Sequence, residues 1–142
     1  MTSNPFPLCL VRAVFAAFLI LFAVLPAHSA QEGDFTYIPY DSGITITAYT
    51  GAGRAVTIPS TIAGQSVVII RAKAFYNKPN LISVTMPDSV TSIGNSAFSL
   101  CGALTSITIG NGVTSIGDSA FYYSQSLTSI TIPDSVTIIG PG

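Results

Sequence analysis

The sequence predicts a β-rich solenoid, and three observations lead to that prediction. Hydrophobic residues recur every 23 positions through the second half of the chain, as in Leu81, Leu104 and Leu127. A fixed period between about 20 and 50 residues is typical of solenoids, in which each unit stacks on the next. Each unit opens with alternating apolar and polar residues, which favours a short strand. Pro, Gly and Asp or Asn then follow at matching places, which indicates a turn at the same point of every unit.

Residues 1–30 have the pattern of a secretory signal peptide. Arg12 and the amino terminus supply positive charge, and Ala13–Leu25 is an unbroken apolar run of 13 residues. This length fits the apolar region of a signal peptide and is shorter than the ~20 residues that span a bilayer. Cleavage after Ser29 and cleavage after Ala30 are both open, and an uncleaved membrane anchor is the alternative. We expect export, with membrane contact only through this segment.

Residues 31–53 are predicted to form a β-hairpin that caps the solenoid. Two runs rich in β-branched and aromatic residues, Phe35–Ile38 and Ile44–Tyr49, flank an Asp-Ser-Gly turn signal. Strict alternation would place Ile44 and Ile46 on one face of the second strand and Tyr49 on the other. A solenoid needs such a cap because its first hydrophobic layer is otherwise open to water.

Residues 54–142 form the predicted repeat array. A degenerate repeat at 54–80 is followed by full repeats at 81–103 and 104–126, and by a partial repeat at 127–142. In the first repeat the strand residues lie 28 rather than 23 positions before their counterparts. We place the resulting five-residue insertion near Thr61–Gln65, where Gly64 permits a turn.

Each unit is expected to contain two short strands and one helical turn. Residues 104–109 alternate so that Leu104, Ile107 and Ile109 face inward. A second extended piece follows at 113–116. A glycine corner comes next, and Asn95 or Asp118 is expected to cap one helical turn carrying an Ala-Phe pair. The corner glycines are Gly94, Gly117 and Gly140.

The repeat resembles the BspA-like, bacterial surface-antigen class of leucine-rich repeats. The shared pattern is L-x-x-I-x-I-P-x-x-V-x-x-I-G-x-x-A-F-x-x-C, and it covers the chain from about residue 55 to the end. One unit carries it at Leu81, Val84, Met86, Pro87, Val90, Ile93, Gly94, Ala97, Phe98 and Cys101. The departures are Gly110 in place of Pro and Ser124 in place of Cys. The resemblance implies a leucine-rich-repeat solenoid in a secreted or surface-attached bacterial protein, with relatives that act in adhesion.

Composition and charge argue against several classes of function. Only 8% of residues are charged, and the four basic and six acidic residues after position 30 give a net charge of −2. A nucleic-acid partner is therefore not expected. The one histidine, His28, lies in the predicted signal peptide, and no cluster has metal-ligand spacing. Asp88 and Asp134 align across two repeats but are expected to be turn residues. We expect no catalytic residue, no metal, no cofactor and no enzyme activity.

Cys101 is expected to be a small buried side chain. Once the segment with Cys9 is removed it has no cysteine partner for an internal disulfide. No cationic residue near it in the sequence indicates a reactive thiol.

The candidate binding face consists of outward-facing Ser and Thr residues on the first strand of each unit. They are expected to stack in two rows, Ser83, Ser106 and Ser129 in one and Thr85, Thr108 and Thr131 in the other. A third row, Thr91, Thr114 and Thr137, should lie on the neighbouring face. These hydroxyls either bind a partner through hydrogen bonds or only keep an exposed strand soluble. A regular Thr lattice also suits ice or a crystalline glycan.

Tyr122 and Tyr123 follow the Ala-Phe pair of one unit. One of them is expected to pack between turns of the solenoid and the other to be exposed.

The size of the face limits what it can bind. Four strands with four exposed residues each give roughly 200 Å², whereas a specific protein interface needs about 800 Å² per partner. The chain is therefore part of a longer array, a weak binder, or self-associating through an open C-terminal end. The predicted function is an exported, non-enzymatic module for adhesion or protein interaction at the bacterial cell surface, with an extracellular protein, host protein or glycan as partner. The alternative is a structural spacer or envelope-layer segment of a larger repeat protein.

Overall fold

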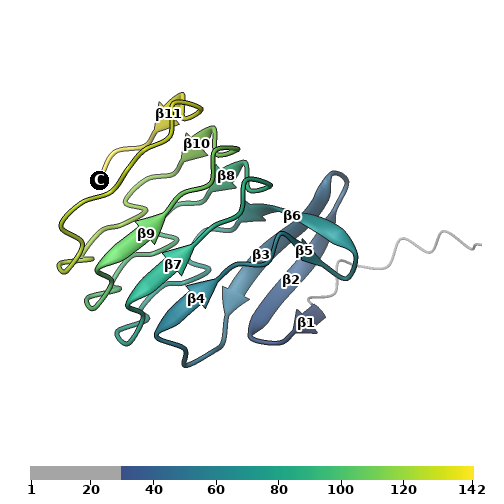
Figure 1. Ribbon diagram of the computed structural model, residues 1–142, viewed down its shortest axis with the longest axis horizontal. Helices are drawn as coiled ribbons and strands as arrows, with labels where there is room; N and C mark the ends of the chain where they lie inside the picture. Colours follow the sequence, from purple (N-terminus) through teal and green to yellow (C-terminus); the bar gives the residue numbers. More distant parts are fainter. Residues whose placement is uncertain (1–29) are drawn as a thin grey trace, which may run out of the picture.

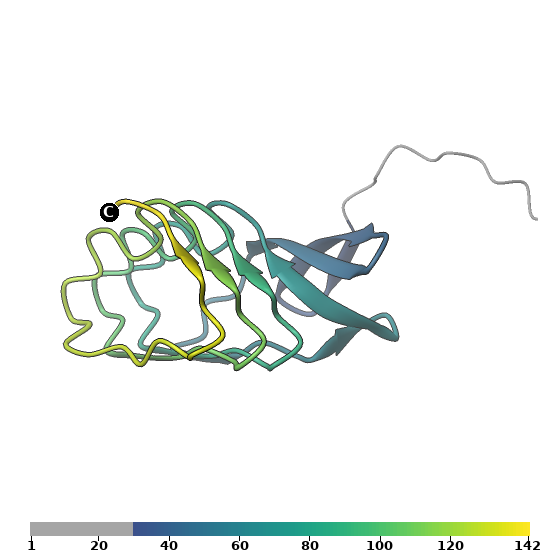
Figure 2. The same cartoon turned by 90° about the horizontal axis from the view of Figure 1, so that it is seen from above.

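The computed structural model describes residues 30–142, so the predicted signal peptide up to residue 29 lies outside the described residues. The described chain winds into successive coils that stack side by side (Figure 1). Seen from above, each coil crosses from one sheet to the other and returns through a run of turns (Figure 2). The prediction of a β-solenoid is confirmed.

Two parallel sheets run through the repeat array. The first strands of successive coils, β4 (Ala55–Thr57), β7 (Ser83–Thr85) and β9 (Ser106–Thr108), form a three-stranded sheet. The second strands, β6 (Gln65–Ile70), β8 (Ser92–Ile93), β10 (Ser115–Ile116) and β11 (Ile138–Ile139), form the other sheet. Ser83 lies beside Ser106, and Ile93 lies beside Ile116. The 23-residue period of the sequence is thus the register of both sheets.

The N-terminal hairpin extends one of these sheets. β1 (Ala30–Glu32), β2 (Phe35–Tyr40) and β3 (Gly43–Tyr49) pair antiparallel, and β3 then pairs parallel with β6. Ile44 and Ile46 are buried beside the first coil. The hairpin therefore covers the first hydrophobic layer and also satisfies the strand edge of β6 with hydrogen bonds.

The predicted orientation of Tyr49 is wrong. Tyr49 is buried and its ring stacks on Phe75, with centroids 5.1 Å apart. The β2–β3 register shifts between Thr36 and Tyr37, because Thr36 pairs with Ala48 while Tyr37 pairs with Ile46. This irregularity adds one residue, Thr47, to β3 and resets the alternation of its side chains. Ile46 and Tyr49 consequently both face the core.

The insertion in the first repeat forms a small hairpin of its own. β5 (Thr61–Ile62) pairs antiparallel with the start of β6. Ala63 and Gly64 connect the two strands, and both have positive φ, 50° and 76°. Two consecutive left-handed residues are typical of a type I′ hairpin turn. The predicted position of the insertion is therefore right.

The predicted helical turn in each repeat is wrong, because the described residues contain no helix. Ser96 and Leu100 in one coil have left-handed φ values of 54° and 60°, which interrupt a helical path. The backbone N–H of Phe98 donates to Ala120 in the next coil at 2.8 Å. Asn95 does not cap a helix either, since its Oδ1 accepts a hydrogen bond from the Asp118 N–H at 3.0 Å. The backbone N–H groups that would bond within a helix thus donate to carbonyl groups of the neighbouring coil instead.

An aromatic ladder fills the corner of the core beneath these turns. Phe75 and Phe98 are fully buried and stack with centroids 4.8 Å apart, and Phe98 stacks on Phe121 at 5.8 Å. Tyr49 of the hairpin continues the ladder on the other side of Phe75. One aromatic ring per layer therefore joins the cap to the coils through direct ring contacts.

The corner glycines are needed because adjacent coils approach closely there. A Cβ added to Gly117 would lie 2.6 Å from the backbone nitrogen of Asn95, and one added to Gly94 would lie 2.7 Å from the carbonyl carbon of Arg71. Real Cβ atoms are not found at such distances from backbone atoms. These glycines therefore set how tightly the coils stack.

Candidate binding face

The hydroxyl face is the outer surface of β4, β7 and β9. Its side chains are Thr57, Ser83, Thr85, Ser106 and Thr108. The register aligns Thr57 with Thr85 and Thr108 in one row, and Ser83 with Ser106 in another. Val84 and Ile107, between them in sequence, are buried on the opposite side. Alternation along each strand thus anchors the face to the core and leaves its hydroxyls outside.

Thr57 belongs to this face although it was not among the predicted residues. Its signal was present in the sequence, because Val56-Thr57-Ile58-Pro59 matches Val84-Thr85-Met86-Pro87 across the 28-residue offset of the first repeat. The insertion lies after these residues, so it leaves the strand pairing of Thr57 with Thr85 intact.

Ser129 and Thr131 are exposed but do not extend the two rows as strand residues. No strand is assigned between residues 117 and 137, so β9 pairs only with β7 in the described chain. The predicted strand here is wrong. The sheet consequently has three strands. Thr57 extends the Thr row at the N-terminal end, and Thr131 does not extend it at the C-terminal end.

The hydroxyls of the face differ from those of the neighbouring Thr row in their hydrogen bonding. Thr91 Oγ1 donates to the Val68 carbonyl, and Thr114 Oγ1 donates to the Thr91 carbonyl, each at 3.1 Å. Thr137 Oγ1 continues this ladder to Thr114 at 3.2 Å. Among residues 30–142, no such bond is found for Ser83, Thr85, Ser106 or Thr108. The neighbouring row therefore strengthens the contacts between coils, whereas the hydroxyl face keeps its donors and acceptors available.

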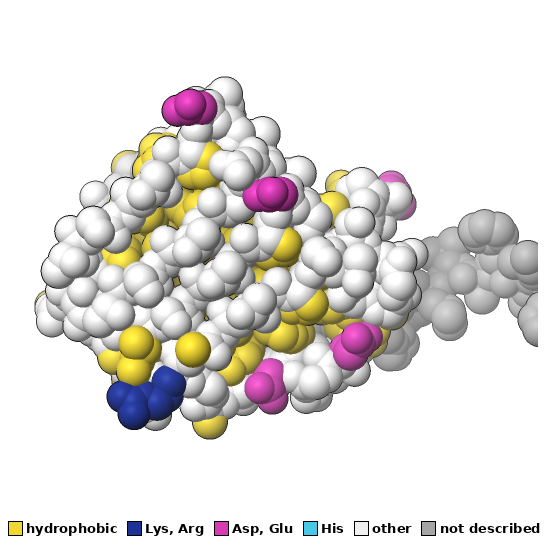
Figure 3. Space-filling model, in the orientation of Figure 1, with side chains coloured by type: hydrophobic (Ala, Val, Ile, Leu, Met, Phe, Trp, Pro, Cys, Tyr) yellow, Lys and Arg dark blue, Asp and Glu magenta, His cyan; other side chains and the backbone are white. Residues whose placement is uncertain are grey.

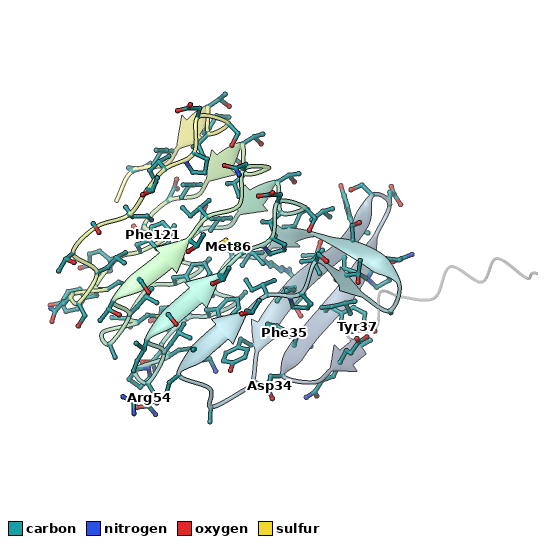
Figure 4. The ribbon with its side chains drawn as sticks, viewed as in Figure 1. Asp34, Phe35, Tyr37, Arg54, Met86 and Phe121 are labelled. Atoms are coloured by element: carbon teal, nitrogen blue, oxygen red, sulfur yellow. The ribbon has the colours of Figure 1, made fainter. Side chains whose placement is uncertain are left out.

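The electrostatic character of the face is close to neutral. Charged side chains lie toward the rim of this side of the molecule rather than over the three strands (Figure 3). Arg54 projects outward at the start of β4, while Met86 points inward between the sheets (Figure 4). A partner of this surface would be recognised by shape and hydrogen bonds, with little electrostatic steering.

Residues 30–142 contain no cluster of side chains suited to metal binding. No group of three or more His, Cys, Asp or Glu side chains in this range is placed to hold a metal ion. Asp88 accepts a hydrogen bond from the Asn111 N–H at 2.7 Å, which is the turn role expected of it. In the same range there is also no helix with the length and apolar character needed to cross a bilayer.

Cys101 is a buried link between coils. Its Sγ donates to the carbonyl oxygen of Phe75 at 3.2 Å. Burial raises the pKa of the thiol, and the backbone N–H and the charge of Lys78 oppose this only in part. The thiol is therefore neutral at physiological pH, and the prediction of a small buried side chain is confirmed.

The area of the hydroxyl face is small. Three strands of three residues, at about 4.8 Å between strands and 3.3 Å per residue, cover roughly 140 Å². This is less than one fifth of the ~800 Å² that each partner contributes to a specific protein interface. A single copy of this face cannot by itself supply a tight protein complex.

A hollow lies at the C-terminal end of the stack. It has a volume of about 340 Å³ and is lined by residues of the last two coils, including Ile116, Phe121 and Ile139. Ile138 and Ile139 are exposed here. This end of the stack therefore exposes apolar side chains.

Coiled stacking with a 23-residue register, a buried Leu-Val-Ile-Phe layer in each coil and an open hydroxyl face define a leucine-rich repeat protein. The family model described as the BspA type leucine rich repeat region (6 copies) matches residues 55–142. The chain therefore belongs to the BspA-type leucine-rich repeat family.

Solved structures of bacterial proteins share the fold. A leucine-rich repeat protein of T. pallidum is 38% identical with a TM-score of 0.75, over 80% of this chain and 54% of that one. A leucine-rich repeat protein of Bacteroides capillosus is 29% identical with a TM-score of 0.72, over 80% of this chain and 99% of that one. A leucine rich cell surface protein of Faecalibacterium prausnitzii is 38% identical with a TM-score of 0.71, over 79% of this chain and 32% of that one.

The chain spans about half the length of the T. pallidum protein and a third of the F. prausnitzii protein. No curated protein matches it.

Proposed function

We propose that the chain is an exported, non-enzymatic adhesion module that binds an extracellular protein through its hydroxyl face at the bacterial cell surface. The observation that carries the proposal is the difference between the two Thr rows. In one row the hydroxyls donate hydrogen bonds to carbonyl groups of the preceding coil, at Thr91, Thr114 and Thr137. In the other row the hydroxyls face solvent, at the aligned Thr57, Thr85 and Thr108. Similarity to a cell surface protein of F. prausnitzii supports the location.

The proposed binding is weak for one copy and becomes strong when many copies act together. The face offers roughly 140 Å², so a single contact is short-lived. Linked copies raise the apparent affinity by about 10²–10⁴ when they reach several sites at once. A cell surface that displays many copies provides this condition.

Binding to immobilised matrix proteins tests the proposal. Residues 31–142 are coupled to beads at high density and applied to surfaces of laminin and of collagen, with the soluble single chain as the monovalent comparison. We expect saturable bead retention on at least one surface and little retention of the single chain. The double variant Thr85→Ala/Thr108→Ala should abolish bead retention. The variant Thr114→Ala, on the neighbouring row, should leave bead retention unchanged.

The alternative function is a structural spacer, as the ladder of hydroxyl and backbone hydrogen bonds between coils gives the array stiffness. A spacer needs no ligand. Absence of bead retention on every surface, or retention that is equal for the Thr85→Ala/Thr108→Ala variant and the wild type, would contradict the adhesion proposal and leave the spacer as the better account.

A further inference from the structure

Two adjacent tyrosines project from the corner turn of the third coil. Tyr122 and Tyr123 are each 55% exposed, and their ring centroids lie 5.1 Å apart with an angle of 58° between the planes. The expectation that one of them packs between coils is wrong, because Phe121 alone takes the place in the aromatic ladder. The two rings therefore pack against each other and leave about half of each side chain exposed.

A tyrosine at the same corner of an earlier coil is also exposed. Tyr76 occupies the position of Tyr122 two repeats earlier and is 41% exposed. The following coil is stacked on it, since the Asn77 N–H donates to the Ser99 carbonyl at 2.9 Å. A tyrosine at this position therefore reaches solvent even beside a neighbouring coil, whereas the shorter Ser99 at the same position of the second coil is buried.

The fold does not require either tyrosine. The position of Tyr122 is Ser99 in the preceding coil, and the position of Tyr123 is Asn77 in the first. Tyr123 has a left-handed φ of 58°, a conformation that Asn tolerates and that is unfavourable for a bulky side chain. Leu100 stands at the same position with φ 60° but is half-buried, so packing offsets its strain. Tyr123 is exposed and lacks comparable burial, so packing does not offset its strain in the same way.

The sequence around the pair is uncharged, and Tyr122 also borders the hollow at the C-terminal end of the stack. No charged residue occurs between Asp118 and Asp134. Gln125 is exposed beside the pair in sequence, and it adds amide donors and an acceptor. Lys73 lies over the ring of Tyr76 at 5.6 Å, which occupies the face of that tyrosine, whereas the described cation–ring contacts do not include Tyr122 or Tyr123. The pair thus offers free aromatic faces in a neutral setting.

We propose that Tyr122 and Tyr123 form a stacking platform for an uncharged polysaccharide. The face of an aromatic ring is electron-rich and attracts the C–H groups on the flat side of a sugar ring. Hydroxyls around the sugar rim would meet the amide of Gln125. Two rings match one or two sugar units, whereas a protein partner would need about 800 Å². The size and neutrality of the platform therefore favour a glycan.

This site is separate from the hydroxyl face, and the inference does not depend on the proposed adhesion to protein. Glycan binding can be lost by changing the tyrosines while protein binding survives, and the reverse holds for Thr85 and Thr108.

Tyrosine fluorescence provides a direct readout because the chain contains no tryptophan. The full chain is titrated with soluble mannan, a β-glucan and an α-glucan, and with heparin as an anionic comparison. We expect a saturable change with at least one neutral polysaccharide and none with heparin. Affinity electrophoresis through gels containing the same polysaccharides measures binding independently of the tyrosine signal.

The variants separate binding from folding. Tyr122→Ser with Tyr123→Asn introduces the residues found at these positions in other coils, so the double variant is expected to fold and to keep its thermal midpoint. It should lose about tenfold or more in affinity, the scale of two lost ring contacts. Tyr76→Ser and Thr85→Ala/Thr108→Ala should bind as the wild type does. Binding to no neutral polysaccharide, binding to heparin alone, or unchanged binding by the folded double variant would overturn the proposal.

Discussion

The hydroxyl of Ser124 donates a hydrogen bond to the carbonyl oxygen of Phe98 at 2.9 Å, across the boundary between two coils. One repeat earlier, the thiol of Cys101 makes the same connection to Phe75 at 3.2 Å. Both donors are buried. The departure from the family pattern at Ser124 therefore keeps the hydrogen bond and changes only the donor atom.

Replacing Ser124 with Ala should lower the free energy of unfolding by about 1–2 kcal/mol, because the buried carbonyl of Phe98 loses its donor. Ser124→Cys is the matched control, since it restores the family residue and a donor, and it should lie within about 0.5 kcal/mol of the wild type. Urea denaturation followed by circular dichroism measures both. Equal stability of Ser124→Ala and the wild type would show that this bond does not stabilise the stack.

Gly117→Ala should be strongly destabilising, because the added Cβ would lie 2.6 Å from the backbone nitrogen of Asn95. Overpacking of this kind costs about 1–3 kcal/mol. Gly102→Ala tests the same substitution at a site where no atom lies within 4 Å of the added Cβ, and a change of at most about 0.5 kcal/mol is expected. Thermal midpoints of the two variants check the difference. Similar midpoints would mean that the coils can separate at the corner without cost.

Thr114→Val should cost about 0.5–1 kcal/mol, because the Oγ1 bond to Thr91 is lost while the side-chain shape is kept. Thr108→Val removes an exposed hydroxyl for which no hydrogen bond is found in the described chain, so its stability should match the wild type or exceed it slightly. Chemical denaturation measures the free energy of unfolding of both variants. The difference shows which Thr row stabilises the contact between coils and which does not. A larger loss for Thr108→Val than for Thr114→Val would reverse these assignments.

Stability should fall at alkaline pH through Cys101. Burial raises the pKa of this thiol above its ordinary value of 9.0, so the folded state holds the proton more tightly than the unfolded chain does. The contribution is complete below pH 9.0 and is lost as the pH rises through the higher folded pKa.

Urea denaturation of residues 31–142 between pH 7 and pH 10 measures this loss. Cys101→Ser is the control, because Ser124 shows that a hydroxyl can fill the same position, and its stability should decline less over this interval. A thiol reagent should also label Cys101 slowly unless urea is added. Parallel declines for the two proteins, or rapid labelling in the folded state, would contradict the buried, neutral thiol.

The corner turns show where local sequence is misleading. Asn95, followed closely by Ala97, has the composition of a capped helical turn. The N–H of Phe98 nevertheless bonds to Ala120, and the N–H of Leu100 bonds to Tyr122. A helix needs those donors for itself, so the stacking of the next coil decides against it. Propensity alone cannot detect an acceptor that lies a repeat away.

The sequence by itself determines the repeat length, the inward residues of the strands in the repeat array and the presence of a hairpin before the array. These follow from spacing and alternation, because a period of 23 must become the register once coils stack. Only the tertiary structure decides that Tyr49 turns inward at an irregular pair, that Ser129 and Thr131 lie outside the sheet, and which Thr row has free hydroxyls. Each of these depends on whether a backbone group of a neighbouring strand or coil lies about 3 Å away, which a one-dimensional pattern does not contain.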